Sequence, residues 1–285
     1  MTLTWGVAGA VLFAALLHAG WNALVKSSTD KQLDTALIHL IGSAIGLPLM
    51  LAVGVAPMAA WPYIAASVVI HVAYYVALTS AYQHGDLGLT YPLMRGVGPV
   101  LVALSATLTV GEHLSPLAWA GVLGVCGGTL LLGLSPRAFE QPRAIVFALI
   151  NAVVIAVYTV VDALGARAAV QAGGSAVQYV ALLFVFDGWP FALMVLHKRG
   201  LAVAMPYARA RLPVATVAAA ASLGAYGIAL WAMTLAPVAT VAALRETSVL
   251  FAALLGTWFL KEVFTVRRAL GTVAIVAGVM ALRLG

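Results

Sequence analysis

Residues Gly88–Val110 read GLTYPLMRGVGPVLVALSATLTV, an apolar run of 23 residues whose single charged side chain is Arg95. A helix that crosses a bilayer needs about 20 apolar residues, whereas a barrel strand needs roughly half that number. Inside lipid every backbone polar group has to be paired within the structure, and an α-helix pairs them within the segment. The stretch therefore predicts a membrane-spanning helix that carries one arginine.

The rest of the chain has the same apolar character. Of its 285 residues, 64% are hydrophobic and 8% are charged, against about 25% charged residues in a soluble domain. The net charge of +6 lies mainly in short breaks between apolar runs, a pattern of membrane orientation rather than of a nucleic-acid surface. The single cysteine, Cys126, offers neither a disulfide nor a thiolate metal site. We expect an all-α membrane protein with no nucleic-acid partner and no cofactor.

Apolar runs between polar breaks predict ten transmembrane helices. The first run has no basic stretch before it and no small-residue cleavage site after it, so we expect a helix there rather than a cleaved signal. The predicted spans are Thr4–Val25, Thr35–Gly54, Trp61–Gln83, Gly88–Val110, Ser115–Leu134, Arg143–Leu164, Ser175–Leu196, Leu212–Leu235, Val238–Leu260 and Arg267–Leu284.

The opening stretch recurs 150 residues later as Val238–Leu260, which reads VATVAALRETSVLFAALLGTWFL. At this shift Arg95 aligns with Arg245, and further matches are Glu112 with Glu262, Gly121 with Gly271 and Gly128 with Gly278. A polar break with prolines separates residues 1–135 from residues 142–285, so we predict two related five-helix units. Because five is odd, the second unit must enter the membrane inverted. Inverted repeats place a substrate site near the midplane, between the halves.

Lysines and arginines are distributed unequally between the two sides of the predicted bundle. The odd-numbered connections hold 11 of them, whereas the even-numbered connections and the termini hold only Arg167 and Arg283. Basic loops are retained in the cytoplasm. The distribution therefore predicts that both termini lie outside.

Three segments together resemble a known family. They are His18–Lys26 (HAGWNALVK), Gly85–Pro99 (GDLGLTYPLMRGVGP) and Gly111-Glu112, which precedes a glycine-rich run. Over essentially the whole chain the sequence resembles the EamA-type transporters of the drug/metabolite transporter superfamily. The resemblance implies a secondary carrier of small metabolites, often an exporter, with a central cavity, and we expect it in the bacterial cytoplasmic (inner) membrane. Many relatives are thought to keep both termini in the cytoplasm, opposite to the orientation that the charges predict.

Charged residues inside spans usually face a cavity or a partner, because they are costly in lipid. Arg95 and Arg245 are therefore predicted to bind a carboxylate or a similar anion, which guanidinium groups hold bidentately. The alternative is a structural role, with Arg245 beside Glu246 and Arg95 paired with Asp86. Two prolines and two glycines within Pro92–Pro99 should weaken or break the helix around Arg95.

Two carboxylates inside spans, Asp187 and Glu246, are candidates to carry a coupling proton, because burial favours the neutral form of a carboxyl group. The simpler alternative is that each one neutralises an arginine.

Aromatic and polar residues on several spans are candidate cavity walls. His71, Tyr75, Leu78 and Tyr82 recur at intervals that place them on one helical face. The remaining candidates for substrate contact are His18, Trp21 and Asn22 on the first span and Tyr158, with Asp162, on the sixth. Ordinary helix packing is the alternative for each of them. We interpret the motifs Gly42–Gly46 and Gly124–Gly128 as close helix packing, and Glu112 as a structural residue.

The function predicted from the sequence is secondary transport of an organic anion or an amino acid-like zwitterion by alternating access, with export as the direction. Enzyme motifs such as His-Glu-x-x-His, Gly-x-Ser-x-Gly or a Walker loop do not occur. The alternatives are an exporter of drugs or other cations and a lipid-phosphate flippase. Expected partners are the substrate, membrane lipid and possible coupling protons, and the protein is either a monomer or a homodimer.

Overall fold

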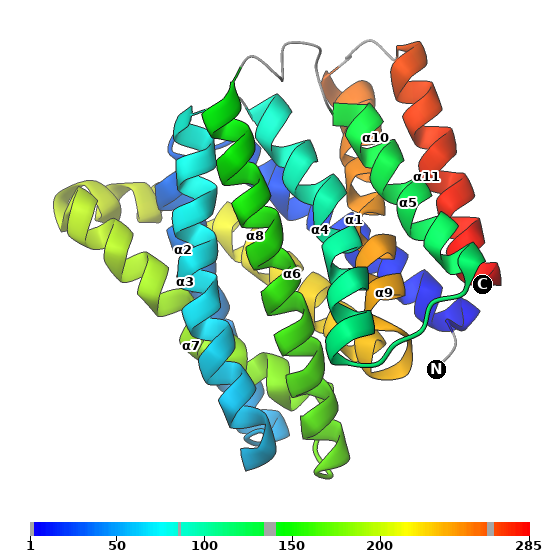
Figure 1. The fold of residues 1–285 in the computed structure, drawn as a ribbon. Coiled ribbons are helices and arrows are strands. Elements are labelled where there is room, and N and C mark those ends of the chain that lie inside the picture. The colour runs from blue at the N-terminus through cyan, green and yellow to red at the C-terminus, as the bar shows by residue number, and fades with distance from the viewer. Residues whose placement is uncertain (1–2, 85–86, 134–140, 261–264) are drawn as a thin grey trace.

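The computed structural model describes residues 3–84, 87–133, 141–260 and 265–285, and within them every regular element is a helix (Figure 1). The elements are α1 (Trp5–Lys26), α2 (Lys31–Val53), the short 3-10 helix η1 (Met58–Ala60), α3 (Trp61–His84), α4 (Leu87–Thr109), α5 (Pro116–Gly133), α6 (Pro142–Gln171), α7 (Ala176–Arg199), α8 (Leu201–Leu235), α9 (Val238–Arg245), α10 (Thr247–Leu260) and α11 (Val266–Leu284). The predicted all-α class is confirmed.

The helices have the length and surface of membrane spans. Within the described residues, eight of them are long and apolar enough to cross a bilayer. Large apolar side chains such as Leu51, Leu108 and Val273 point outward and are at least 65% exposed. An apolar exterior of this extent requires a lipid environment, so the protein crosses the membrane several times.

Each predicted span coincides with a helix or a pair of helices, but several bounds differ. α8 starts at Leu201, whereas the sequence predicts a loop up to residue 211. The helix is 35 residues long and continues without a break through Pro206 and Pro213. α6 continues to Gln171, past the predicted end at Leu164. The break expected around Arg95 is absent, since α4 is continuous through Pro92 and Pro99. The interruption falls instead in the ninth span, at Glu246, between α9 and α10.

Glycines allow two pairs of helices to approach closely. A Cβ added at Gly128 would lie 2.7 Å from the carbonyl oxygen of Gly271, so the backbones of α5 and α11 touch there. On the other side of the bundle, a Cβ at Gly188 would lie 2.3 Å from the carbonyl oxygen of His39, which fixes α7 against α2. Contacts this close need residues without side chains. The glycine motif on α5 is therefore a packing feature, as predicted.

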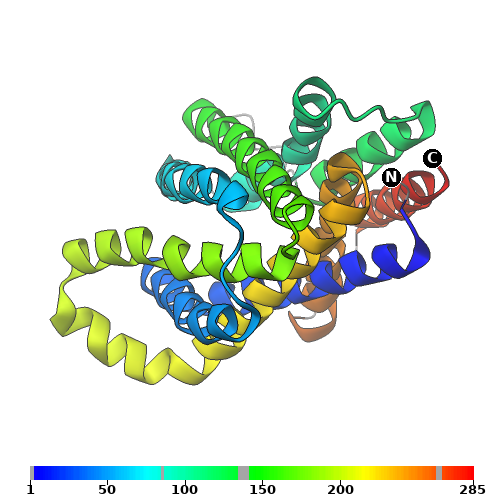
Figure 2. The ribbon, with the colours of Figure 1, turned by 90° about the horizontal axis from the view of Figure 1, so that it is seen from below.

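The two chain ends lie side by side. Viewed from the side and from below, the beginning of α1 is next to the end of α11 (Figures 1 and 2). The guanidinium of Arg283 lies 4.5 Å from the centre of the Trp5 ring, a cation–π contact. An even number of membrane crossings accounts for both ends being on one side.

Candidate functional site

Arg95 is buried and ion-paired with a residue from the other half of the chain. It projects from α4 and is 9% exposed. Its Nε lies 2.8 Å from Oε2 of Glu246, at the α9–α10 junction, and its Nη2 donates a hydrogen bond of 3.2 Å to Oγ of Ser248. The interruption after α9 thus presents a carboxylate and a hydroxyl to the arginine of α4. The sequence analysis considered Glu246 beside Arg245, whereas the structure pairs Glu246 with Arg95. Asp86, the partner considered for Arg95, lies outside the described residues.

Arg245, which aligns with Arg95 in the sequence, has a different environment. It is the last residue of α9, and its guanidinium carbon lies 5.5 Å from the centre of the Tyr226 ring. No carboxylate oxygen in the described part of the chain lies within 4.0 Å of it. Its only close compensation there is a cation–π contact, which is weaker than an ion pair in a dry site.

The two arginines meet at a hollow between α4, α6 and α9. Its lining residues are Met94, Arg95, Gly98, Pro99, Val102, Ile155, Tyr158, Thr159, Ala242, Arg245 and Glu246. Three of these side chains are charged, two positively and one negatively. The free space suits a water molecule rather than an organic substrate. The structure therefore shows a closed hollow with an excess of one positive charge.

Tyr158 connects this hollow to a second polar region. Its ring stacks on that of His71 with a centroid distance of 4.5 Å. One turn away on α6, Asp162 is fully buried and accepts hydrogen bonds from two tyrosine hydroxyls, those of Tyr179 (2.7 Å) and Tyr226. The guanidinium of Arg245 lies over this same Tyr226 ring. The hydrogen bond to Asp162 therefore holds the ring that Arg245 contacts.

The second polar region is built around Asp187. Its carboxylate lies between His71 of α3 and His39 of α2, at 3.7 Å and 3.8 Å. The hydroxyl of Tyr75 is 2.9 Å from Nε2 of His39. His71 and Tyr75 thus share a helical face as predicted, and that face meets α2 and α7.

The remaining candidates lie away from the lining of the hollow. His18 is bonded to Trp21 of its own helix, with the indole Nε1 donating to the imidazole Nδ1 at 3.3 Å. Asn22 donates to the carbonyl oxygen of His18 at 2.8 Å. None of these three residues lines the hollow. The side chain of Tyr82 lies outside the described residues.

Ion pairs hold both ends of the bundle. Near the termini, Nη2 of Arg167 donates to Glu112 at 2.7 Å, and the same carboxylate accepts from the backbone N–H of Val238 at 2.8 Å. Glu112 therefore joins α6 to the start of α9, in agreement with its predicted structural role.

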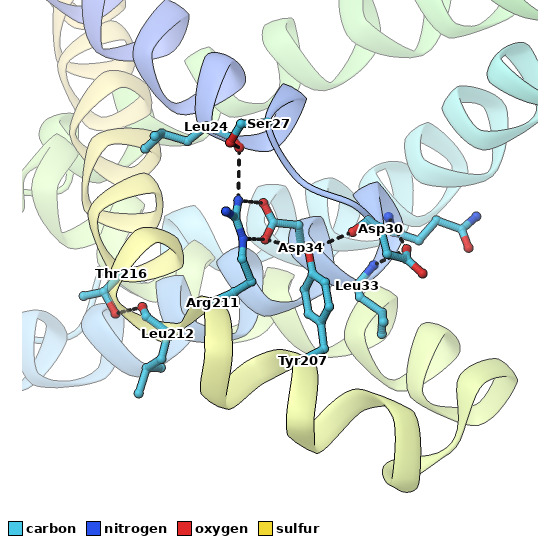
Figure 3. A network of polar contacts seen from close by, with 10 residues as sticks. Leu24, Ser27, Asp30, Leu33, Asp34, Tyr207, Arg211, Leu212 and Thr216 are labelled. Carbon is cyan, nitrogen blue, oxygen red and sulfur yellow. Dashed lines mark hydrogen bonds and ion pairs between the residues drawn. The ribbon is translucent and has the colours of Figure 1, made fainter.

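The opposite end is held by the network in Figure 3. Arg211 of α8 donates from Nε to Asp34 of α2 at 3.0 Å and from Nη2 to the carbonyl oxygen of Leu24 on α1 at 3.1 Å. Tyr207, one turn before Arg211, donates to Asp34 at 3.1 Å. Asp34 is buried, so these contacts compensate its charge.

Sequence reasoning missed several members of these groups. His39 carried a usable signal, because it is a titratable residue inside an apolar run, as Asp187 is. Ser248 and Tyr179 carried none, since a serine or tyrosine in a span is common in any helix bundle.

The comparisons with known proteins agree with this architecture. A family model described as the EamA-like transporter family matches residues 142–284. One crystal structure of a protein superposes on the chain with a TM-score of 0.75 at 20% sequence identity, covering 98% of each chain. At that identity the superposition shows a shared fold. Since the family model matches half of the sequence, this multi-pass membrane protein belongs to the EamA-like transporter family, part of the drug/metabolite transporter superfamily.

Proposed function

We propose that the protein is a secondary transporter that binds a small organic anion, or an amino acid-like zwitterion through its carboxylate, at Arg245. The family is one of transporters rather than enzymes. The site is the hollow between α4, α6 and α9, where Tyr158 offers an aromatic surface to the organic part of the substrate. As the family resemblance implies, the proposed direction is export.

The observation that carries this proposal is the charge of the hollow. Glu246 is the only carboxylate among its described lining residues, and it forms its ion pair with Arg95. Arg245 is left as a cation without an anionic partner within 4.0 Å in the described chain. A cation inside a membrane protein is costly unless an anion or a cavity compensates it. A carboxylate-bearing substrate supplies such an anion.

Helix packing supports alternating access between two inverted units, residues 1–135 and 142–285. If one predicted half is laid on the other, α3 corresponds to α8 and α6 corresponds to α1. In the structure α3 packs on α6 and α1 packs on α8, so each of these two contacts corresponds to the other. Likewise, the contacts of α2 with α7 and of α5 with α11 each join corresponding helices. A packing pattern that maps onto itself is expected of a two-fold carrier.

The two terminal ion-pair networks fit the same mechanism. Arg167–Glu112 closes the end near the termini, and Arg211–Asp34 closes the opposite end. Both are formed here, together with a hollow too small for a substrate. We propose that opening either end breaks one network while the other persists, which gives access from one side at a time.

A ligand screen on the purified protein tests the substrate class. The apparent melting temperature is measured against small carboxylates, zwitterionic amino acids, lipophilic cations and anionic phospholipids, for wild type and Arg245→Gln. A ligand present at about 100 times its dissociation constant stabilises the folded state by about 2.7 kcal/mol. Stabilisation of wild type by carboxylates or zwitterions, and its loss in Arg245→Gln, is the expected result.

Two other outcomes would overturn the proposal. If only lipophilic cations stabilise the protein, the arginines are structural and the chain is an exporter of cationic compounds. If only anionic phospholipids do so, the site recognises a lipid phosphate and the chain is a flippase.

A further inference from the structure

A second group of titratable side chains lies outside the hollow, where α2, α3 and α7 meet. Asp187 Oδ2 is 3.8 Å from His39 Nδ1, and Asp187 Oδ1 is 3.7 Å from His71 Nδ1. Gly188 places the carboxylate there, because without a side chain it lets α7 touch the backbone of His39. The three residues, called the His39–His71–Asp187 group below, come from two predicted halves.

The Asp187 carboxylate is incompletely hydrogen-bonded, unlike the other buried aspartate nearby. Asp162 receives two tyrosine hydroxyls, whereas Oδ1 of Asp187 is buried without a hydrogen-bond partner among the described residues. Asp187 is 8% exposed. A buried polar atom without a partner is costly, and a proton bound close to it lowers that cost.

Within the described part of the chain, this carboxylate has no permanent cation beside it. Among the described residues, no lysine or arginine nitrogen is within 4.0 Å of Asp187, so only the two imidazoles can neutralise it. Histidine changes its charge between about pH 5 and 8, which makes that neutralisation dependent on a proton. Other titratable or charged groups on the surrounding helices include Tyr74, Tyr75, Asp34 (paired with Arg211), Tyr158, Asp162, Tyr179, Tyr207 and Tyr226. Of these, Tyr75 also forms a side-chain hydrogen bond with Asp187.

The hydrogen bonds of His71 leave one of its ring nitrogens available to bind a proton. Its Nδ1 lies 2.9 Å from the carbonyl oxygen of Ser67, which can only accept a hydrogen bond. We therefore assign the ring hydrogen of the neutral form to Nδ1. An added proton then goes to Nε2, and the ring becomes an imidazolium next to the carboxylate.

We propose that the His39–His71–Asp187 group is a proton-binding site, distinct from the anion site at Arg245 and coupled to it through the His71–Tyr158 stack. The proposal rests on the proposed transport function. With both imidazoles neutral the group carries one negative charge; one bound proton makes it neutral.

The coupling has a definite sign. Tyr158 lines the anion hollow and stacks on His71, so the two sites are one aromatic ring apart. Removing a negative charge at a distance of roughly 10 Å and an effective dielectric constant of about 20 strengthens anion binding about tenfold. By reciprocity the bound anion raises the proton affinity equally.

The first test needs no ligand. Protons bound by the purified protein between pH 8 and pH 5 are counted in weakly buffered solution for wild type, His71→Gln, Asp187→Asn and the control His84→Gln. His84 lies at the exposed end of α3, so its variant controls for the loss of a histidine outside the group. Asp187→Asn leaves both histidines in place and removes the carboxylate between them. If the group is a coupled site, this variant still shifts the proton uptake of the histidines to lower pH by about one unit.

The second test separates this proposal from the transport function. The affinity of the carboxylate that stabilises the protein best is measured at pH 5.5 and pH 8. Wild type and His84→Gln should bind about tenfold more tightly at pH 5.5, and His71→Gln and Asp187→Asn should show no such difference. Unchanged proton uptake in Asp187→Asn, or pH-independent affinity in wild type, overturns the proton site alone. Failure of every anion to bind, with the uptake shift present, overturns the anion site alone.

Discussion

Arg95 and Arg245 occupy the same place in two stretches of sequence 150 residues apart, yet the fold treats them differently. Arg95 is buried on a continuous helix and bound to Glu246 and Ser248. Arg245 ends a short helix, rests on the ring of Tyr226 and has no carboxylate within 4.0 Å among the described residues. Arg95 is thus ion-paired within the described structure, while Arg245 is the residue that we propose to bind the substrate.

The difference arises from a single acidic residue. Glu246 follows Arg245 directly, whereas the residue after Arg95 is Gly96. The second stretch therefore supplies the carboxylate that the first one lacks, and it supplies it across the interface between the halves. Two positions that align in the sequence thus hold an ion-paired arginine and an arginine that, within the described residues, has no carboxylate within 4.0 Å.

The largest expected effect belongs to the ion pair. Arg95→Gln leaves Glu246 buried without its partner, and breaking a buried pair in this way costs about 3–5 kcal/mol of folding stability. We expect the melting temperature of the purified protein to fall strongly, and Glu246→Gln to produce a similar fall. A melting temperature near that of wild type in both variants would show that the pair is not structural.

The next effect concerns the unpaired arginine. Arg245→Gln removes a cation that has no anionic partner in the described chain, so the stability of the protein should change little. The best carboxylate ligand, however, loses its charge-assisted contact with the guanidinium, which contributes about 1.5–3 kcal/mol to binding. We expect its affinity to fall by tenfold or more in a binding titration. Arg245→Lys keeps the positive charge but lacks the planar guanidinium, so its ligand affinity should lie between those of wild type and Arg245→Gln.

A smaller effect is expected at the platform below Arg245. Tyr226→Leu removes the ring that holds the guanidinium, a contact of about 0.5–2 kcal/mol, so ligand affinity should fall by up to about tenfold. Tyr226→Phe keeps the ring and loses only the hydroxyl bound to Asp162. Equal affinities for the two variants would mean that the ring does not position Arg245.

The smallest effect is expected when both partners of the pair are neutralised. Arg95→Gln combined with Glu246→Gln leaves no buried charge uncompensated, and replacement of a whole buried pair is often close to neutral. The double variant should melt near wild type, well above either single variant. Additive losses in the double variant would contradict the assigned pairing.

The fold was largely predictable because it follows from simple regularities. Apolar runs of about 20 residues located the helices, eight of which, within the described residues, are long and apolar enough to span a membrane. The recurrence of an arginine and several glycines at one shift led to the prediction of two units, which stays a prediction. The predicted start of α8 was wrong, because Pro206, Arg209 and Arg211 near its start are typical of a loop. The helix persists there where Arg211 and Tyr207 are bound to Asp34.

The site was predicted only in part. The arginines inside the spans were found by the cost of charge in lipid, but their pairing was not. Arg245 and Glu246 are neighbours in sequence, and adjacent residues on a helix point in different directions. Only the packing of α4 against α9 shows that the carboxylate turns towards Arg95. A contact between residues this far apart in the chain cannot be predicted from a single sequence.

The central claim is that Arg245, rather than the Arg95–Glu246 pair, supplies the charge that binds the substrate. Equilibrium binding of the best carboxylate ligand to wild type, Arg245→Gln and the Arg95→Gln/Glu246→Gln double variant tests this most directly. The account predicts that the double variant binds within a few-fold of wild type, while Arg245→Gln binds at least tenfold more weakly. Wild-type affinity in Arg245→Gln, together with loss of binding in the double variant, would contradict it.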